Sequence, residues 1–384
     1  MAERNSPLIL GTEPIGKLLI QYSVPAIIAM TVTSLYNIID SIFIGHGVGA
    51  LAIAGLAITF PLMNLVVAFC TLVGIGGATI SSIFLGQKDK VRATEVVHNV
   101  LIMCIINAVC FGGLTFLFLD SILLFFGASH DTLPYARDFM QVILLGTPIT
   151  YVFIGLNNVM RATGYPRKAM FSSLLTVGCN IILAPIFIFS FDWGIRGAAL
   201  ATVVSQTVAM VWVLVHFANK KNFIHFDRRY SRLKVRVVAK IFSIGMSPFL
   251  MNVCACVVVI FINNALQHTG GDLAIGAYGI VNRTLMLFVM IVMGITQGMQ
   301  PIVGYNYGAK QYERVRKTLR YGITAGRYYG GLCIERIIPP CYRGDVYNQR
   351  GVGRFVCDRS SYQLCHVPVC RLPDCNFQFL SVDR

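Results

Sequence analysis

Three segments of the chain recur in the same order farther along, each about 222 residues after its first copy. The recurring segments belong to apolar runs that are long enough to cross a membrane. A chain built in this way is expected to fold as two related halves, a plan common among secondary transporters, whose substrate site lies between the halves. The paired segments are residues 23–25 and 246–248, 51–58 and 273–280, and 86–92 and 308–314.

Apolar residues dominate the composition: 55% of the residues are hydrophobic, 13% are charged, and the mean hydropathy is +0.67. A typical soluble domain carries about 25% charged residues, so this chain is expected to be an all-α, multi-pass membrane protein. Apolar runs of about 20 residues predict membrane-spanning helices. Eight are predicted, at residues 16–39, 50–76, 95–119, 136–158, 168–191, 194–217, 238–266 and 274–304.

The net charge of +15 is distributed as a topology signal. Cations gather after spans two, four, six and eight, and the alternate loops carry few of them. Because cytoplasmic loops are rich in Lys and Arg, this alternation predicts a cytoplasmic N-terminus and a cytoplasmic basic linker at 218–237, and it argues against nucleic-acid binding. The cations after span four are Arg161, Arg167 and Lys168.

The last 58 residues, 327–384, have a different composition, with eight Arg, no Lys and six Cys. They contain no apolar run of spanning length. Three interpretations compete: a disulfide or metal-binding appendage, a disordered tail, and a frameshifted translation of further spans, which is the favoured one. The predicted organisation is a complete six-helix lobe at 1–217, the linker, and the start of a second lobe at 238–326 with two helices and a loop.

Ionisable side chains inside membrane spans are costly and are therefore functional candidates. Asp40 lies near the end of the first span, and Tyr36 precedes it by four residues, so both lie on one helix face. A carboxylate there can bind a proton or Na⁺. The alternative is an interfacial residue that hydrogen-bonds to backbone.

Several uncharged polar residues and one cation in the spans are candidates for lining a substrate cavity. Thr202 and Gln206 share a helix face, although small neighbours such as Gly197 also fit simple close packing of helices. The cavity candidates are Asn157, Gln206, Asn263, Gln297 and Arg283. The sequence has no phosphate-binding loop and no metal-spaced histidines, so we expect neither an enzyme nor a cofactor.

Four motifs, taken together, resemble the multidrug and toxic compound extrusion (MATE) family of the MOP-type superfamily, over about residues 10–326. They are residues 36–40 with the 51–55 loop, 161–166, 194–202 and 297–316. The resemblance implies twelve helices in two six-helix lobes around a central cavity, of which the first lobe and about two helices of the second are present here. It also implies antiport of drugs or organic cations against H⁺ or Na⁺.

Carried over by motif, the family's cation site in the first lobe would use Asp40, Asn180 and Thr202, with Tyr36 beside them. The sequence differs from the family pattern at one position. Family members often carry Asp before the proline of span five, and this chain has Ala184 there instead. One carboxylate then favours a single H⁺ or Na⁺, and no other metal is expected.

The expected setting is a monomer in the bacterial inner membrane, in contact with lipids and small-molecule drugs. One alternative is a flippase for lipid-linked precursors. A flippase should line its cavity with several cations, and the spans offer Arg283 alone. The other alternative is an inactive remnant of the exporter.

Overall fold

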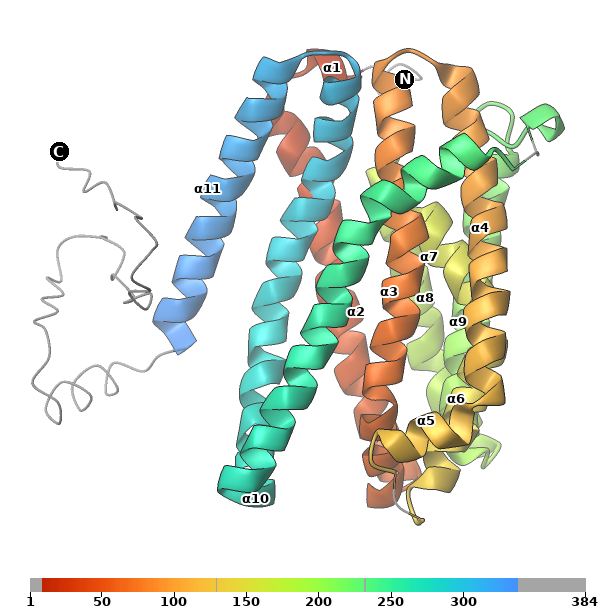
Figure 1. Cartoon of the computed structure of the whole chain (residues 1–384), viewed down its shortest axis with the longest axis vertical. Helices are drawn as coiled ribbons and strands as arrows, with labels where there is room; N and C mark the ends of the chain where they lie inside the picture. The colour runs from red at the N-terminus through yellow and green to blue at the C-terminus, as the bar shows by residue number, and fades with distance from the viewer. Residues whose placement is uncertain (1–8, 129, 231–232, 338–384) are drawn as a thin grey trace, which may run out of the picture. The chain divides into compact units, whose positions relative to one another are not determined.

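The computed structural model describes residues 9–128, 130–230 and 233–337, except for the side chains of Asn37, Ala50, Arg228, 259–260, 263–288 and 329–337 (Figure 1). No strand occurs in these ranges, so the all-α prediction is confirmed. The helices are α1 (Ile9–Thr12), α2 (Ile15–Gly47), α3 (Ala50–Gly86), α4 (Lys90–Leu117), α5 (Leu119–Phe125), α6 (Leu133–Leu145), α7 (Thr147–Ala162), α8 (Pro166–Pro185), η2 (Ile186–Ser190), α9 (Gly194–Ala218), η3 (Arg228–Tyr230), α10 (Val235–Gly308) and α11 (Tyr312–Ile337).

Six helices of the described residues are long and apolar enough to cross a membrane, and the bent pair α6–α7 can supply a seventh crossing. These seven coincide with the first seven predicted spans. Much of the predicted span at 274–304 falls among side chains outside the described set, although its backbone is helical throughout. The multi-pass membrane fold therefore follows from the length and apolarity of the helices.

The fourth predicted span, at 136–158, is broken rather than continuous. Helix α6 ends at Leu145, α7 begins at Thr147, and the two axes differ by 56°. Pro148 lies in the first turn of α7, where its missing N–H costs no helical hydrogen bond. Apolarity alone does not reveal the break, but the Gly146–Pro148 sequence is a helix-start signal that accounts for it.

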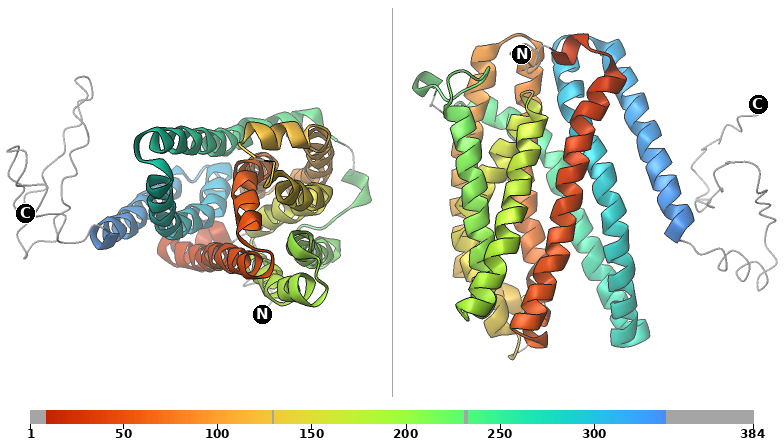
Figure 2. Two further views of the ribbon diagram at one scale, coloured as in Figure 1. Left: turned by 90° about the horizontal axis from the view of Figure 1, so that it is seen from below. Right: turned by 180° about the vertical axis from the view of Figure 1, so that it is seen from behind.

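Helix α10 is assigned as one element of 74 residues, yet it must reverse direction. A straight helix of that length would extend for about 110 Å, several membrane thicknesses. Near its start, Gly245 approaches Leu72 and Ile241 approaches Gly76, so α10 runs antiparallel to α3. Near its end, Gly304 approaches Ser82 and Gly308 approaches Ile83, so the direction is parallel. Figures 1 and 2 show the two arms side by side, as two predicted spans require.

The segment 238–326 was expected to contain two helices and a loop, but the structure has a further helix in it. This helix is α11, which begins at Tyr312. Thr318 is fully buried, and a Cβ on Gly322 would collide with Met299 of α10, so one face of α11 packs on α10. The charged residues of α11, among them Glu313, Arg316, Lys317 and Arg320, lower the hydropathy of this helix below that of a membrane span. The chain divides into two compact units after Gly326, and the described part of the second is the end of α11.

Two apolar clusters form the core of the first unit. One joins α2, α3, α4, α7, α9 and α10 around Val97, Tyr151 and Phe217. The other joins the opposite ends of α2, α3, α8 and α9 to α5 and α6 around Ile44 and Met140. Helix α3 packs against α4, α7 and α10, while α8 packs against α2 and α9. This arrangement brings distant polar residues of α2, α8 and α9 together.

Candidate functional site

Helices α2, α8 and α9 each contribute one side chain to a polar cluster inside the bundle. The Tyr36 hydroxyl lies 3.1 Å from Thr202 Oγ1, and either oxygen can donate the hydrogen bond. Asn180 Nδ2 donates to Thr202 Oγ1 at 3.1 Å and to the Tyr36 hydroxyl at 3.5 Å. Three of the four residues expected at the cation site, from three separate helices, are therefore in direct contact.

Asp40 lies one helical turn beyond Tyr36 on α2, on the same helix face. Only 9% of Asp40 is exposed, and its Oδ1 has no hydrogen-bond partner among the described residues. A buried carboxylate oxygen without a partner is costly in its charged form. A bound proton or cation would relieve that cost, so this oxygen is a suitable ligand for either.

The backbone beside the cluster is irregular. Helix α8 ends at Pro185, and the next residues, Ile186–Ser190, form a π-helical turn, a feature often found at functional sites. Ala184 is fully buried one turn after Asn180, so the family's second acid would have pointed into the same packed region. The substitution by Ala leaves Asp40 as the acid of this cluster.

The cavity candidate Gln206 lies against α7 rather than against α2 or α8. Its side-chain oxygen accepts a hydrogen bond from the Thr150 hydroxyl, while Thr202, one turn earlier, faces the Tyr36 cluster. Helix α9 thus presents Gln206 to α7 and Thr202 to α2 and α8.

Asn157 serves the packing of α7 on α8. It is 4% exposed, and its Nδ2 donates to the Ala169 carbonyl at 3.1 Å and to Ser172 Oγ at 2.5 Å. These bonds satisfy the buried amide, as buried polar groups require. Of the other cavity candidates, Gln297 is described below, and the side chains of Asn263 and Arg283 lie outside the described residues.

Arg161 was expected among the cytoplasmic loop cations, and this placement is wrong. It belongs to α7 and is 6% exposed. Its guanidinium donates to the Gln297 side-chain oxygen of α10 and to Asn157 Oδ1 at 3.3 Å. The residue thus joins the first half of the chain to the second. The four-residue spacing between Asn157 and Arg161 could have indicated their contact on one helix face. The contact with Gln297 of α10 could not be read from spacing, because the two residues are 136 positions apart.

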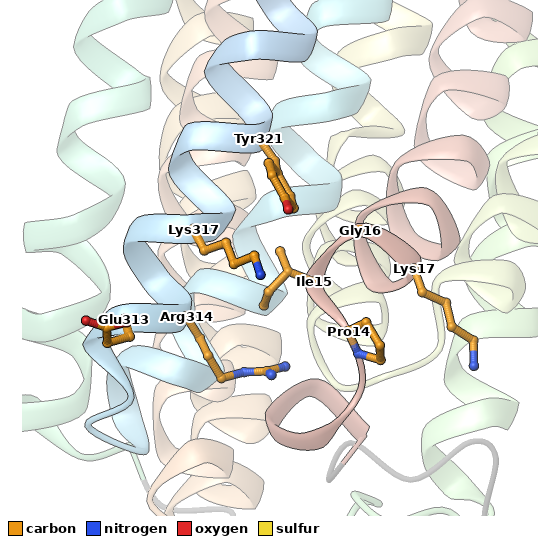
Figure 3. Close-up of a pocket in the computed structure, with 8 residues that line it drawn as sticks. All are labelled: Pro14, Ile15, Gly16, Lys17, Glu313, Arg314, Lys317 and Tyr321. Carbon is orange, nitrogen blue, oxygen red and sulfur yellow. The ribbon is translucent and has the colours of Figure 1, made fainter.

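Among the described residues, two open cavities lie away from the Tyr36 cluster. One, of about 320 Å³, lies along α9 between Val204 and Val211. The other, of about 460 Å³, lies between the starts of α2 and α11 (Figure 3). Among the described residues, no group of three or more His, Cys, Asp or Glu side chains could hold a metal ion.

Known proteins with similar sequences are multidrug exporters. The chain is 31% identical over 328 residues to the multidrug export protein MepA of Staphylococcus haemolyticus strain JCSC1435, covering 84% of this chain and 71% of that protein. It is 30% identical to MepA of Staphylococcus aureus strain NCTC 8325 / PS 47, covering 78% of this chain and 66% of that one. The chain thus spans about two thirds of the length of these relatives.

Solved structures show the same fold. A structure described as the outward-facing conformation of a multidrug resistance MATE family transporter of the MOP superfamily superposes with a TM-score of 0.82 at 24% identity, covering 87% of this chain and 74% of that one. The family model called MatE matches residues 25–186 and 244–334, more than half of the chain. These two blocks fall in the two related halves of the sequence. The chain therefore belongs to the MatE family, the multidrug and toxic compound extrusion transporters, and is not an enzyme.

Proposed function

We propose that this protein exports drugs or organic cations in exchange for H⁺ or Na⁺, with Asp40 as the residue that binds the coupling ion. The observation that carries the proposal is the buried Oδ1 of Asp40, which has no hydrogen-bond partner in the described part of the chain and lies one helical turn from Tyr36 of the Tyr36–Asn180–Thr202 cluster. The similar proteins are named multidrug export proteins, and this supports drugs as the class of substrate.

The chemistry of the cluster suits a single small cation. Asp40 supplies the charge, and the hydroxyl oxygens of Tyr36 and Thr202 supply neutral ligands nearby. Asn180 donates its amide hydrogens within the cluster, which leaves its carbonyl oxygen as a further ligand. Binding a proton or Na⁺ neutralises the buried carboxylate, so the protein's conformational preference changes with ion occupancy.

The proposed orientation places the N-terminus in the cytoplasm of a bacterial cell, with the protein a monomer in the inner membrane. Gly86 approaches Tyr305, and Lys234 forms an ion pair with Glu95 at 2.5 Å, so the loops after spans two, six and eight gather at one end of the bundle. The surface ion pairs Arg137–Asp120 and Arg196–Asp138 belong to the alternate loops. This distribution supports the positive-inside orientation.

The test compares Asp40→Asn with Asp120→Asn in purified protein. Asp120 is a matched control because its carboxylate is half exposed in a surface pair with Arg137. The first readout is the unfolding temperature in NaCl against choline chloride, and as a function of pH. The second is export of a fluorescent organic cation from proteoliposomes under an imposed H⁺ or Na⁺ gradient.

We expect the control to keep the ion dependence of unfolding and any gradient-driven export, and Asp40→Asn to lose both. Dependence on Na⁺ at constant pH would assign Na⁺ as the coupling ion, and dependence on pH alone would assign H⁺. Unchanged ion dependence in Asp40→Asn would refute the proposed role of Asp40.

A further inference from the structure

The pocket between α2 and α11 is built from the first turn of one helix and the first turns of the other. Its volume is about 460 Å³, and three of its residues are cationic while one is acidic. Figure 3 shows the Arg314 and Lys317 side chains extending toward α2, with Glu313 directed away from it. The lining residues are Pro14, Ile15, Gly16, Lys17, Glu313, Arg314, Lys317 and Tyr321.

Of the three cations, Lys317 is the one available to an external anion. Lys17 is paired with Glu13 at 2.9 Å. Arg314 supports the pocket wall, because it donates to the backbone carbonyls of Leu10 and Glu13 at 3.2 and 2.6 Å and to Asn306 at 2.9 Å. Lys317 has no carboxylate within ion-pair distance among the described residues. It contacts the Tyr321 ring, with the ammonium 5.8 Å from the ring centroid.

An exposed apolar stripe continues from the pocket along α2. Gly16 lines the pocket, and Ile20, Val24 and Ile28 follow it at intervals of four residues, so they share one helix face. Ile20 is 66% exposed, Val24 45% and Ile28 40%. A Cβ added to Gly16 would meet nothing within 4 Å, so the passage from pocket to stripe is open. The cationic pocket suits the phosphate headgroup of a phospholipid, and the apolar stripe suits one of its acyl chains.

We propose that this pocket binds the phosphate of an anionic phospholipid, with Lys317 as its main cationic contact and an acyl chain along the α2 stripe. Basic pockets between helices at the membrane surface are suited to anionic headgroups. A free phosphate ion could contact Lys317 but would make no apolar contact with Ile20 or Val24. A phospholipid should therefore bind more tightly than free phosphate.

The experiment adds phosphatidylglycerol to the purified full chain in detergent and measures the concentration that gives half of the maximal rise in unfolding temperature. Phosphatidylcholine and sodium phosphate at equal ionic strength are the comparison ligands. Lys317→Gln should need about fivefold more phosphatidylglycerol, from the typical strength of one cation at an anionic surface. Lys317→Arg should bind as the wild type does.

Two further variants distinguish binding in this pocket from general attraction of an anionic lipid to a basic surface. Arg316→Gln removes a cation one position away on α11, outside the pocket lining, and should leave phosphatidylglycerol binding unchanged. Gly16→Phe keeps every charge and fills the passage, and should weaken binding. Wild-type binding by both Lys317→Gln and Gly16→Phe would overturn the site, as would equal stabilisation by phosphatidylcholine. Equal stabilisation by sodium phosphate would overturn the lipid assignment. None of these outcomes bears on Asp40.

Discussion

Glycines at the α3–α10 contact allow the two helices to approach at backbone distance, and Gly245→Ala should destabilise the protein. A Cβ at Gly245 would collide with the Leu72 carbonyl oxygen and lie 2.7 Å from its carbonyl carbon. Backbone atoms cannot rotate away as a side chain can, so the helices themselves must separate. Gly113 is the matched control, because it lies within α4 and a Cβ there would meet nothing within 4 Å.

The magnitude follows from two opposing contributions. Replacing a helical glycine by alanine favours the helix by about 1 kcal/mol, at either position. Overpacking costs about 1–3 kcal/mol, and a backbone collision should lie toward the upper end of that range. Gly113→Ala should therefore gain about 1 kcal/mol and Gly245→Ala should lose about 1–2 kcal/mol, a difference of about 2–3 kcal/mol.

Thermal unfolding of the two purified variants in one detergent measures this difference. At about 2–4 °C per kcal/mol, the value for a domain of about 150–250 residues, Gly245→Ala should melt roughly 5–10 °C below Gly113→Ala. Equal melting temperatures, or a more stable Gly245→Ala protein, would refute the close approach of α3 and α10. A lower melting temperature in Gly113→Ala would show instead that alanine is unfavourable in these helices for another reason.

Three further substitutions test other contacts. Thr202→Val retains the side-chain shape but loses the hydroxyl that contacts Tyr36, so the Na⁺ or H⁺ concentration needed for half-maximal thermal stabilisation should rise about fivefold, the effect of one hydrogen bond. Glu95→Gln breaks the partly buried ion pair with Lys234 and should lower the unfolding temperature by about 2–4 °C. Arg137→Gln removes a surface pair and should shift the unfolding temperature by less than about 2 °C.

Apolar length predicted where helices lie better than where they end or bend. Helix α3 was predicted to end at residue 76 and continues to Gly86, because its terminus depends on the turn before Asp89 and not on hydropathy. Asp89 accepts a hydrogen bond from the Arg92 N–H at 2.9 Å and thereby caps α4. Helix α11 was missed because its charged residues lower its hydropathy, and the residues that pack on α10, such as Thr318 and Gly322, are small rather than strongly apolar.

Local spacing predicted contacts on one helix and could not predict partners on another. The four-residue interval placed Tyr36 and Asp40 on one face without any tertiary information. Arg161 shows the limit, because its charge near a span end is typical of a loop cation. Its burial depends on Gln297, which α10 delivers from the second half of the chain.

Asn157 and Asn180 show why residue type alone cannot distinguish a binding residue from a packing residue. Both are buried asparagines in spans of the first lobe, with 4% and 2% exposure. The Asn157 amide donates to the backbone and a serine of a neighbouring helix, and its oxygen accepts from Arg161, so both ends of its amide have partners. Asn180 contacts the hydroxyl groups of Tyr36 and Thr202 through its Nδ2, in a cluster one helical turn from Asp40, whose Oδ1 has no hydrogen-bond partner among the described residues. The neighbours of each amide therefore decide its role. An amide whose hydrogen bonds are all made by packing partners stabilises the fold. An amide in a polar cluster close to an acid without a partner can help to form a site for an ion.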